Sequence, residues 1–246
     1  MMPPKLEIEN QNYSQGGEDG IIEHLISVID KPNKVCVEIG WGNDGKKSRN
    51  GLAVNCTQNL VQNHNYTCFA FDAKPQQSVP KNVNFYNTYV TPDNVDSYFK
   101  KISTVVDFFS LDIDSYDFAV MEKLFSLGFS PTIICAEINR SMKNDFEFSF
   151  PYITDGEWNK KTLHGVSIKK YITFLESQGY TFFTLCSTGV NAFFYKSDRL
   201  DTNKLTTNVL HEIPHIQEAA MSKDDFYKML MQHKYWKNHI TLDMFK

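Results

Sequence analysis

The sequence lacks long apolar runs and carries no strong excess of charge of either sign. No stretch approaches the roughly 20 apolar residues of a membrane span, and the opening MMPPKLEIENQ has no apolar centre typical of a secretion signal. The formal net charge is only -4, and no basic tract interrupts the chain. These absences predict a cytoplasmic protein with no membrane span and no nucleic-acid partner.

Cysteine is scarce, with five residues in 246, and no two of them form a CxxC pair. Disulfide-stapled folds and zinc ribbons need such pairs or regular spacings, so the sequence disfavours both. Four of the five cysteines lie in or beside apolar runs. Buried free thiols in a reducing compartment are therefore expected.

Short β-branched or aromatic runs alternate with segments of helical spacing along most of the chain. Strands are expected at 35–39, 66–73, 83–90, 107–114 and 132–139. Helices are expected at 18–30, 51–63, 91–102, 118–129 and 165–180. This alternation is typical of a parallel sheet with helices on both faces.

Two further runs, 180–187 and 190–197, are separated only by Thr188 and Gly189. A parallel crossover needs about a dozen residues, so these runs predict an antiparallel hairpin. The expected fold is α/β, with a Rossmann-like, seven-stranded, mostly parallel sheet that ends in this hairpin. The main domain would span residues 1–200, and residues 201–246, with one helix, would pack on it as a tail.

The first predicted strand runs into a glycine-rich turn, VCVEIGWGNDG at 35–45. Gly40, Gly42 and Gly45 have the G-x-G-x-x-G spacing of dinucleotide-binding turns, which is a weak signal alone. Glu38 stands where a phosphate would arrive, and the following KKSRNG is a poor helix start. The sequence therefore disfavours a bound pyrophosphate, and a plain tight turn stays an alternative.

Carboxylates stand at the ends of the predicted strands, where open α/β sheets bind their ligands. They are Glu38, Asp72, Asp112, Asp114 and Glu137. An acidic edge repels a phosphate chain and suits a ligand with a cationic centre and ribose hydroxyls. S-adenosylmethionine has a sulfonium, an ammonium and a ribose but no phosphate, so it fits this pattern. Asp72 would accept hydrogen bonds from the ribose diol.

Several motifs occur in an order that resembles a known enzyme family. NYSQGGEDGIIEHLI, VEIGWGNDGKKSRNGL, LDIDSYDF, IICAEIN and the segment 165–195 together resemble the FkbM-like group of class I S-adenosylmethionine-dependent methyltransferases. The resemblance covers residues 12–198. It implies a sheet with an antiparallel final strand and methyl transfer to a sugar hydroxyl. The favoured substrate is a nucleotide-linked sugar, such as a heptose, used in capsule or surface-polysaccharide biosynthesis.

By position, the resemblance assigns Glu38, Gly40 and Gly42 to the methionine and adenosine side of the cofactor. Gln15 and Asn50 lie in family-like motifs near it, although each also suits a local cap or turn.

Asp72 and Asp112 complete the predicted cofactor residues. Lys74 departs from the neutral or acidic surroundings expected beside Asp72, so the adenine-side contacts stay open.

Methyl transfer to an alcohol requires in-line attack and removal of the hydroxyl proton. A positioned base must take that proton, or a divalent metal must lower the pKa of the hydroxyl. Asp112 and Asp114 end the fourth predicted strand on one face, Glu137 ends the fifth, and His164 precedes a helix. These four residues suit Mg, Mn or Fe(II), and Asp112 or His164 could instead act as the base. Helix capping by the acids and a solvated histidine are the plainer alternatives.

The segment 140–164 is irregular and rich in aromatic residues. We expect it to act as a lid whose rings stack on a sugar or base, or simply to anchor the loop to the core. These rings belong to Phe146, Phe148, Phe150, Tyr152 and Trp158.

Two rival functions remain open at this stage. An NAD(P)-dependent sugar oxidoreductase is disfavoured by Glu38, by the hairpin and by the lack of a Tyr-x-x-x-Lys pair in a predicted helix. A non-catalytic binding subunit would show mutually satisfied acids at 112, 114 and 137. The sequence also leaves the acceptor hydroxyl and any homo-oligomer contact open.

Overall fold

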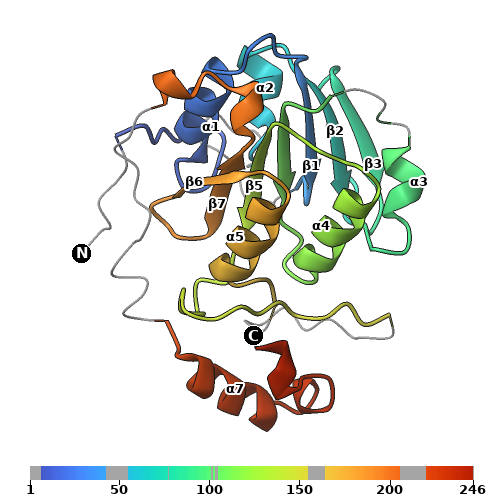
Figure 1. Ribbon diagram of the computed structural model, residues 1–246. Coiled ribbons are helices and arrows are strands. Elements are labelled where there is room, and N and C mark those ends of the chain that lie inside the picture. Colours follow the sequence, from blue (N-terminus) through green and yellow to red (C-terminus); the bar gives the residue numbers. More distant parts are fainter. Residues whose placement is uncertain are drawn as a thin grey trace.

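The computed structural model describes residues 7–42, 55–76, 78–100, 102, 105–154, 164–205 and 220–245. At its centre lies a seven-stranded sheet in the order β3-β2-β1-β4-β5-β7-β6 (Figure 1). The strands are β1 (Val35–Ile39), β2 (Thr67–Asp72), β3 (Val83–Asn87), β4 (Phe108–Leu111), β5 (Ile133–Glu137), β6 (Thr181–Leu185) and β7 (Asn191–Tyr195). β1 to β5 pair in parallel, whereas β7 pairs antiparallel with both β5 and β6. The predicted α/β, Rossmann-like, mostly parallel sheet is confirmed.

The hairpin is confirmed too, with a longer connection than the two residues expected. β6 ends at Leu185 and β7 begins at Asn191. Within the connection, the Cys186 N–H donates to the Asn191 carbonyl at 2.9 Å, and the Gly189 N–H donates to the Cys186 carbonyl at 2.8 Å. Asn191 pairs with Glu137, so the connection lies at the edge where β5 ends.

Helices cover both faces of the sheet, as predicted (Figure 1). They are α1 (Glu18–Ser27), α2 (Gln58–Asn63), α3 (Val95–Phe99), α4 (Asp117–Ser126) and α5 (Ile168–Ser177). α1 and α2 pack on the face that carries Cys36 and Cys68, and α3 to α5 pack on the face that carries Val37 and Phe71. Because successive strand residues point to opposite faces, each buried strand contributes to both cores.

The sheet reverses its winding between β1 and β4, since the chain places β2 and β3 on one side of β1 and β4 and β5 on the other. At such a point the loops after the two central strands separate and frame a ligand crevice. The N–H groups of Gly40 and Trp41 both donate to the Phe71 carbonyl at 2.9 Å. The Asp112 N–H donates to the Ile39 carbonyl at 3.0 Å. These bonds fix the starts of both loops.

The fourth strand ends at Leu111 and not at 114 as predicted. The Asp117 carboxylate accepts the N–H of Ile113 at 2.9 Å and that of Ser115 at 3.0 Å. These bonds curl the chain into the start of α4, and Asp114 adopts a φ of 54°. The expectation that the two aspartates end a strand on one face is therefore wrong, because both lie in the loop after it.

The other predicted helices occur at their expected places, each somewhat shorter. α2 begins at Gln58, and residues 55–57 before it are not helical. The reason is that the N–H groups of Cys56 and Thr57 are bound by Glu38. The predicted start of this helix, at 51–54, lies outside the described residues.

Residues 220–245 form a compact C-terminal unit around α7 (Lys223–Gln232). Its apolar side chains pack against segment 142–150 and form a third hydrophobic cluster with it. The cluster consists of Met142, Phe146, Phe148, Phe150, Phe226, Leu230, Ile240 and Phe245. Figure 1 shows the unit at the end of the molecule where the chain leaves β5. The predicted tail thus packs on the main domain, with residues 220–245 against the segment 142–150 and Asp201 bonded through its N–H to the Val28 carbonyl at 2.9 Å.

Two expectations from composition are met. None of the helices in the described ranges has both the length and the apolar character that a bilayer span requires. All cysteines are free; Cys56 is partly exposed, and the buried ones are Cys36, Cys68, Cys135 and Cys186.

Candidate functional site

Four predicted site residues come together at the carboxyl edge of the sheet. They are Asp112 and Asp114 in the loop after β4, Glu137 at the end of β5, and His164 before α5. Ligand atoms of Asp114, Glu137 and His164 all lie within 4.8 Å of one another. His164 Nε2 is 3.8 Å from Asp114 Oδ1. Two carboxylates and one imidazole at this spacing are a ligand set that Mg²⁺, Mn²⁺ or Fe²⁺ accepts.

Asp112 adjoins this group, because its carboxyl group and that of Glu137 each affect the pKa of the other. Two buried carboxyl groups this close to one another do not both ionise readily. Burial, followed by the negative charge of Asp117, raises the pKa of Asp112 to about 8. Burial also raises the pKa of Glu137 well above its usual range, with the charge of Asp112 as the next cause. The pair therefore holds a proton at neutral pH.

Backbone hydrogen bonds fix His164 beside these acids. Its carbonyl accepts from Asn139 Nδ2 at 2.8 Å. The next residue, Gly165, donates its N–H to the Ser115 carbonyl at 2.9 Å and has a φ of 84°, which favours glycine. The loop after β4, the end of β5 and the segment before α5 are thereby tied together.

Two residues of this site have no role in the sequence prediction, namely Asp117 and Tyr171. Both are fully buried. Burial raises the pKa of the Tyr171 hydroxyl well above its usual range, and the charges of Asp117 and Glu137 raise it further. That hydroxyl has no hydrogen-bond partner among the described residues. Asp117 could be recognised from its place before the apolar run of α4, whereas nothing in the sequence distinguishes Tyr171 from a core residue.

Glu38 binds the segment that precedes α2. Its Oε1 accepts the Cys56 N–H at 3.0 Å, and its Oε2 accepts the Thr57 N–H at 2.8 Å and the Thr57 hydroxyl. Burial raises the pKa of Glu38 to about 7, although these three hydrogen bonds oppose the rise, and the charge of Asp72 adds to it. The negative charge of Asp72 therefore acts on the Glu38 carboxylate. The hydrogen bonds of that carboxylate, however, go to the backbone of Cys56 and Thr57.

Gly40 is required by a close approach of the backbone, whereas Gly42 lies against the ends of the Gln76 and Asp72 side chains. A Cβ on Gly40 would lie 1.6 Å from the carbonyl oxygen of Asp112, and one on Gly42 would lie 2.8 Å from Asp72 Oδ2. The other carboxylate oxygen, Asp72 Oδ1, accepts the N–H of Lys74 at 2.6 Å. The first loop therefore passes directly beside the carboxylate that is predicted to hold ribose, and the backbone of Lys74 orients that carboxylate.

Of the remaining predicted cofactor residues, Gln15 adjoins Gly16, where an added Cβ would lie 2.9 Å from Thr188 in the β6–β7 connection. Gln15 is exposed on the N-terminal loop, where its carbonyl accepts a local hydrogen bond from a nearby side chain. The adjoining residues 12–14 donate their N–H groups to the Asp19 carboxylate at 2.7–2.9 Å. Both readings of Gln15, as a cofactor residue and as part of a local turn, stay predictions. Asn50 and Gly45 lie outside the described residues.

The aromatic insertion 140–164 differs from the expected lid. Three of its rings are buried against the C-terminal unit, and these are Phe146, Phe148 and Phe150. The expectation that these three rings stack on a substrate is wrong, because they anchor the loop. The Tyr152 ring lies 4.8 Å from that of Tyr116, and the Tyr152 hydroxyl donates to Asp93 Oδ2 at 2.8 Å. Trp158 lies outside the described residues.

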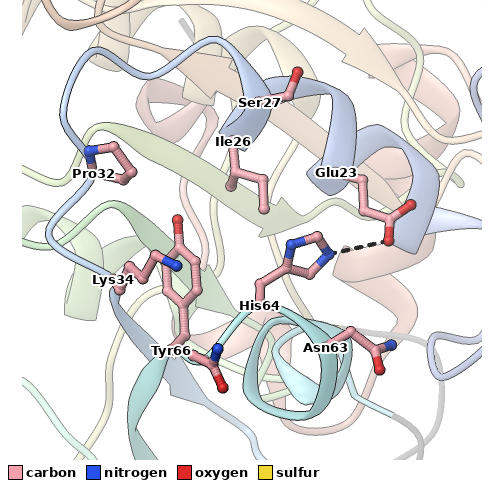
Figure 2. A pocket seen from close by; sticks show the side chains of 9 residues that line it. Glu23, Ile26, Ser27, Pro32, Lys34, Asn63, His64 and Tyr66 are labelled. Atoms are coloured by element: carbon pink, nitrogen blue, oxygen red, sulfur yellow. Dashed lines mark hydrogen bonds and ion pairs between the residues drawn. The ribbon is translucent and has the colours of Figure 1, made fainter.

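A hollow of about 300 Å³ opens at the opposite edge of the sheet, where β1 and β2 begin (Figure 2). Residues that line it include Glu23 and Ile26 of α1, Lys34, His64 and Tyr66. Figure 2 shows the His64 ring turned towards Glu23, with Nε2 3.2 Å from Oε1. None of the predicted catalytic or cofactor residues lines this hollow, so it is separate from the acidic edge.

The chain matches no protein-family model and no curated protein. Any functional proposal therefore depends on the geometry of the acidic edge and on the sequence motifs that supply it.

The raised pKa of Glu38 predicts a pH-dependent stability. The ordinary pKa of the group is 4.5, and burial raises it to about 7 in the folded state. The folded chain therefore binds more protons than the unfolded chain between these values. The contribution of Glu38 to the free energy of unfolding should fall by up to about 3 kcal/mol as the pH rises from 4.5 to 7.

Urea denaturation across this pH range tests the assignment. Glu38→Gln should make the pH profile less steep, with the remaining slope due to Asp112 and Glu137, whereas Glu176→Gln, on the exposed side of α5, should leave the profile as in the wild type. A Glu38→Gln profile with the wild-type slope would contradict the raised pKa.

Proposed function

We propose that this chain is an S-adenosylmethionine-dependent O-methyltransferase that resembles the FkbM-like class I group and acts on a hydroxyl of a nucleotide-linked sugar. The observation that supports this most is the gathering of carboxylates, with one imidazole, at the switch point of the sheet. Such an edge favours a sulfonium over a phosphate chain. The substrate class comes from the resemblance of the motifs, with a capsule or surface-polysaccharide heptose as the preferred acceptor.

Asp72 is the residue that we assign to the ribose. It ends β2, its Oδ1 is held by the Lys74 N–H, and Gly42 places no side chain beside its Oδ2. One carboxylate oxygen is thus fixed while the other adjoins the glycine loop. This is the arrangement that accepts a ribose diol in open α/β sheets.

Asp112 is the base that we assign to the acceptor hydroxyl. A base works best when its pKa lies near the working pH, and burial raises the pKa of Asp112 to about 8. His164, whose imidazole lies beside Asp114, is the alternative base.

Asp114, Glu137 and His164 offer the donor set for a divalent cation, Mg²⁺, Mn²⁺ or Fe²⁺. The fit is supported by Glu137 Oε2, which is buried and has no hydrogen-bond partner among the described residues. When bound, such a cation lowers the pKa of the acceptor hydroxyl. Asp112, whose charge raises the pKa of Glu137, lies next to the proposed cation ligands and would take the hydroxyl proton.

The cofactor is tested by thermal shift with S-adenosylhomocysteine and with NAD. We expect S-adenosylhomocysteine to raise the unfolding temperature and NAD to leave it unchanged. Stabilisation by NAD alone would favour the oxidoreductase and reject the proposal. Incubation with a labelled methyl donor and a panel of nucleotide-activated sugars then identifies the acceptor.

The metal is tested by activity in a chelator. We expect EDTA to abolish methyl transfer and Mn²⁺ or Mg²⁺ to restore it, and His164→Ala to weaken Mn²⁺ binding by at least about tenfold. His64→Ala, which lies in the hollow at the other edge, is the matched control and should bind Mn²⁺ as the wild type does. Activity that is indifferent to EDTA would leave Asp112 or His164 as a plain base.

A non-catalytic binding subunit is the second candidate, and one observation favours it. Glu38, at the same edge, is satisfied by the N–H groups of Cys56 and Thr57 and by the Thr57 hydroxyl, as an acid with a purely structural role would be. Binding of S-adenosylhomocysteine without methyl transfer to any sugar of the panel would support this candidate.

A further inference from the structure

We propose that the C-terminal unit, residues 220–245, positions His164 in the candidate site by holding the segment 146–150 against it. The effect on metal binding rests on the proposed function, whereas the mechanical coupling can be measured without it. The unit itself contributes none of the predicted site residues. Its role follows from a continuous path of contacts that runs from the ring of Phe245 to the backbone beside His164.

The first part of this path is a set of backbone bonds between the two legs of the insertion. The Phe150 N–H donates to the Gly165 carbonyl at 3.1 Å, and the Ser167 N–H donates to the Phe148 carbonyl at 2.8 Å. The Phe148 N–H donates in turn to the Ser167 hydroxyl at 2.9 Å. Residues 148–150 thus lie along one side of the segment that begins with His164. Asn139, which donates to the carbonyl of His164, lies on its other side.

The second part of the path is the ring packing on the far side of these residues. The Phe148 ring stacks on that of Phe245 with centroids 4.4 Å apart, and the Phe150 ring lies 4.7 Å from that of Trp236. Phe226 of α7 contacts both phenylalanines, at 5.7 and 6.2 Å. Each ring of the pair 148 and 150 is at most 2% exposed. The C-terminal unit therefore provides the apolar surface that keeps residues 148–150 in place.

Backbone hydrogen bonds also attach the C-terminal unit to the loop that follows β5. The Met221 N–H donates to the Ser141 carbonyl at 2.8 Å, and the Lys143 N–H donates to the Met221 carbonyl at 3.2 Å. These bonds begin four residues after Glu137, where the chain leaves β5. The unit is thus attached near one ligand of the candidate site and packs on the segment that carries another.

The third cluster shares no member with the two clusters on the sheet. Loosening it should leave the sheet folded and should act on the segment that it supports. A purely structural role of the unit would instead lower the stability of the whole protein and leave His164 as well held as before.

Hydrogen–deuterium exchange of the full chain tests the coupling. In Phe245→Ala, we expect exchange of the amides 148–150 and 165–167 to accelerate at least about tenfold, with β1 and β4 unchanged. Phe245→Leu, which keeps an apolar side chain, should recover most of the protection. Leu242→Ala, at a residue that is 59% exposed on the same unit, is the matched control and should show no change.

A second variant keeps the test informative if Phe245→Ala does not fold. Trp236→Ala removes the ring that contacts Phe150 and should accelerate exchange of the same amides. Protection of 165–167 as in the wild type, in a folded variant whose 148–150 amides exchange faster, would overturn the proposal.

The consequence for the site is measured with Mn²⁺ as the probe. We expect Phe245→Ala to weaken Mn²⁺ binding about tenfold while the affinity for S-adenosylhomocysteine stays within about twofold of the wild type. Wild-type protein that binds no Mn²⁺ would reject the metal part of the proposed function, and the exchange data would still decide the coupling. Wild-type Mn²⁺ affinity in folded Phe245→Ala would overturn the positioning of His164.

Discussion

Replacing Gly40 by alanine is expected to lower the free energy of unfolding by about 4 kcal/mol or more. The added Cβ would lie 1.6 Å from the carbonyl oxygen of Asp112, a separation that no pair of non-bonded atoms tolerates. The backbone cannot move aside easily, because the Gly40 N–H is bonded to Phe71 and the Asp112 N–H is bonded to Ile39. The loops after β1 and β4 would therefore have to separate. Chemical denaturation measures the loss.

Gly128→Ala is the matched control for this substitution. Gly128 has a φ of 82°, close to the 95° of Gly40, but a Cβ there would meet nothing within 4 Å. The cost should therefore be only the backbone strain, about 1 kcal/mol. Similar losses for the two variants would show that strain, and not the close approach of the two loops, makes Gly40 necessary.

Asp112→Asn is expected to reduce methyl transfer by about 10²- to 10⁴-fold without destabilising the fold. The amide cannot take a proton from an acceptor hydroxyl, so the assigned base is lost. The amide has nearly the shape of the carboxyl group and is neutral beside Asp117 and Asp114, as the protonated carboxyl group of Asp112 is at neutral pH. The free energy of unfolding should therefore stay close to that of the wild type.

Turnover and urea denaturation of the same preparation separate the two effects. Asp96→Asn serves as the control, because Asp96 loses its charge on the surface of α3, where it pairs with Lys100 at 3.3 Å. We expect that variant to keep both its activity and its stability. Wild-type turnover by Asp112→Asn would remove Asp112 as the base and direct attention to His164.

The sheet could be predicted because the residue types of each run favour a strand and the lengths of the connections between runs fit the same fold. The β-branched run at 35–39 forms β1 with the predicted ends, and the two runs around Thr188 and Gly189 form the antiparallel pair. The meeting of Asp112 with Glu137 also follows from sequence, since β4 and β5 are neighbours and parallel strands end at the same edge. These features depend on the periodicity of side chains and on connection length.

The parts that could not be predicted depend on contacts between distant segments or on single hydrogen bonds. The end of β4 is decided by the Asp117 carboxylate, which takes two N–H groups that a longer strand would have used. The burial of Phe148 depends on Phe245, which follows it by almost a hundred residues. A phenylalanine-rich loop has the same composition whether it covers a substrate or its own tail. The hydrogen bond from the Thr57 N–H to the Glu38 carboxylate likewise cannot be predicted from the spacing of apolar residues.

The position of β7 between β5 and β6 has a consequence for how the chain matures on the ribosome. β6 is synthesised before β7, yet among the strands of the described residues β7 is the one that pairs with it. Until the chain has grown past Tyr195, β5 is left as an open border whose residues 133–136 are destined to be fully buried. A nascent or misfolded molecule at that stage exposes unpaired backbone N–H and C=O groups of β5, with which other chains can pair. The pairing of β7 with β5 closes this border.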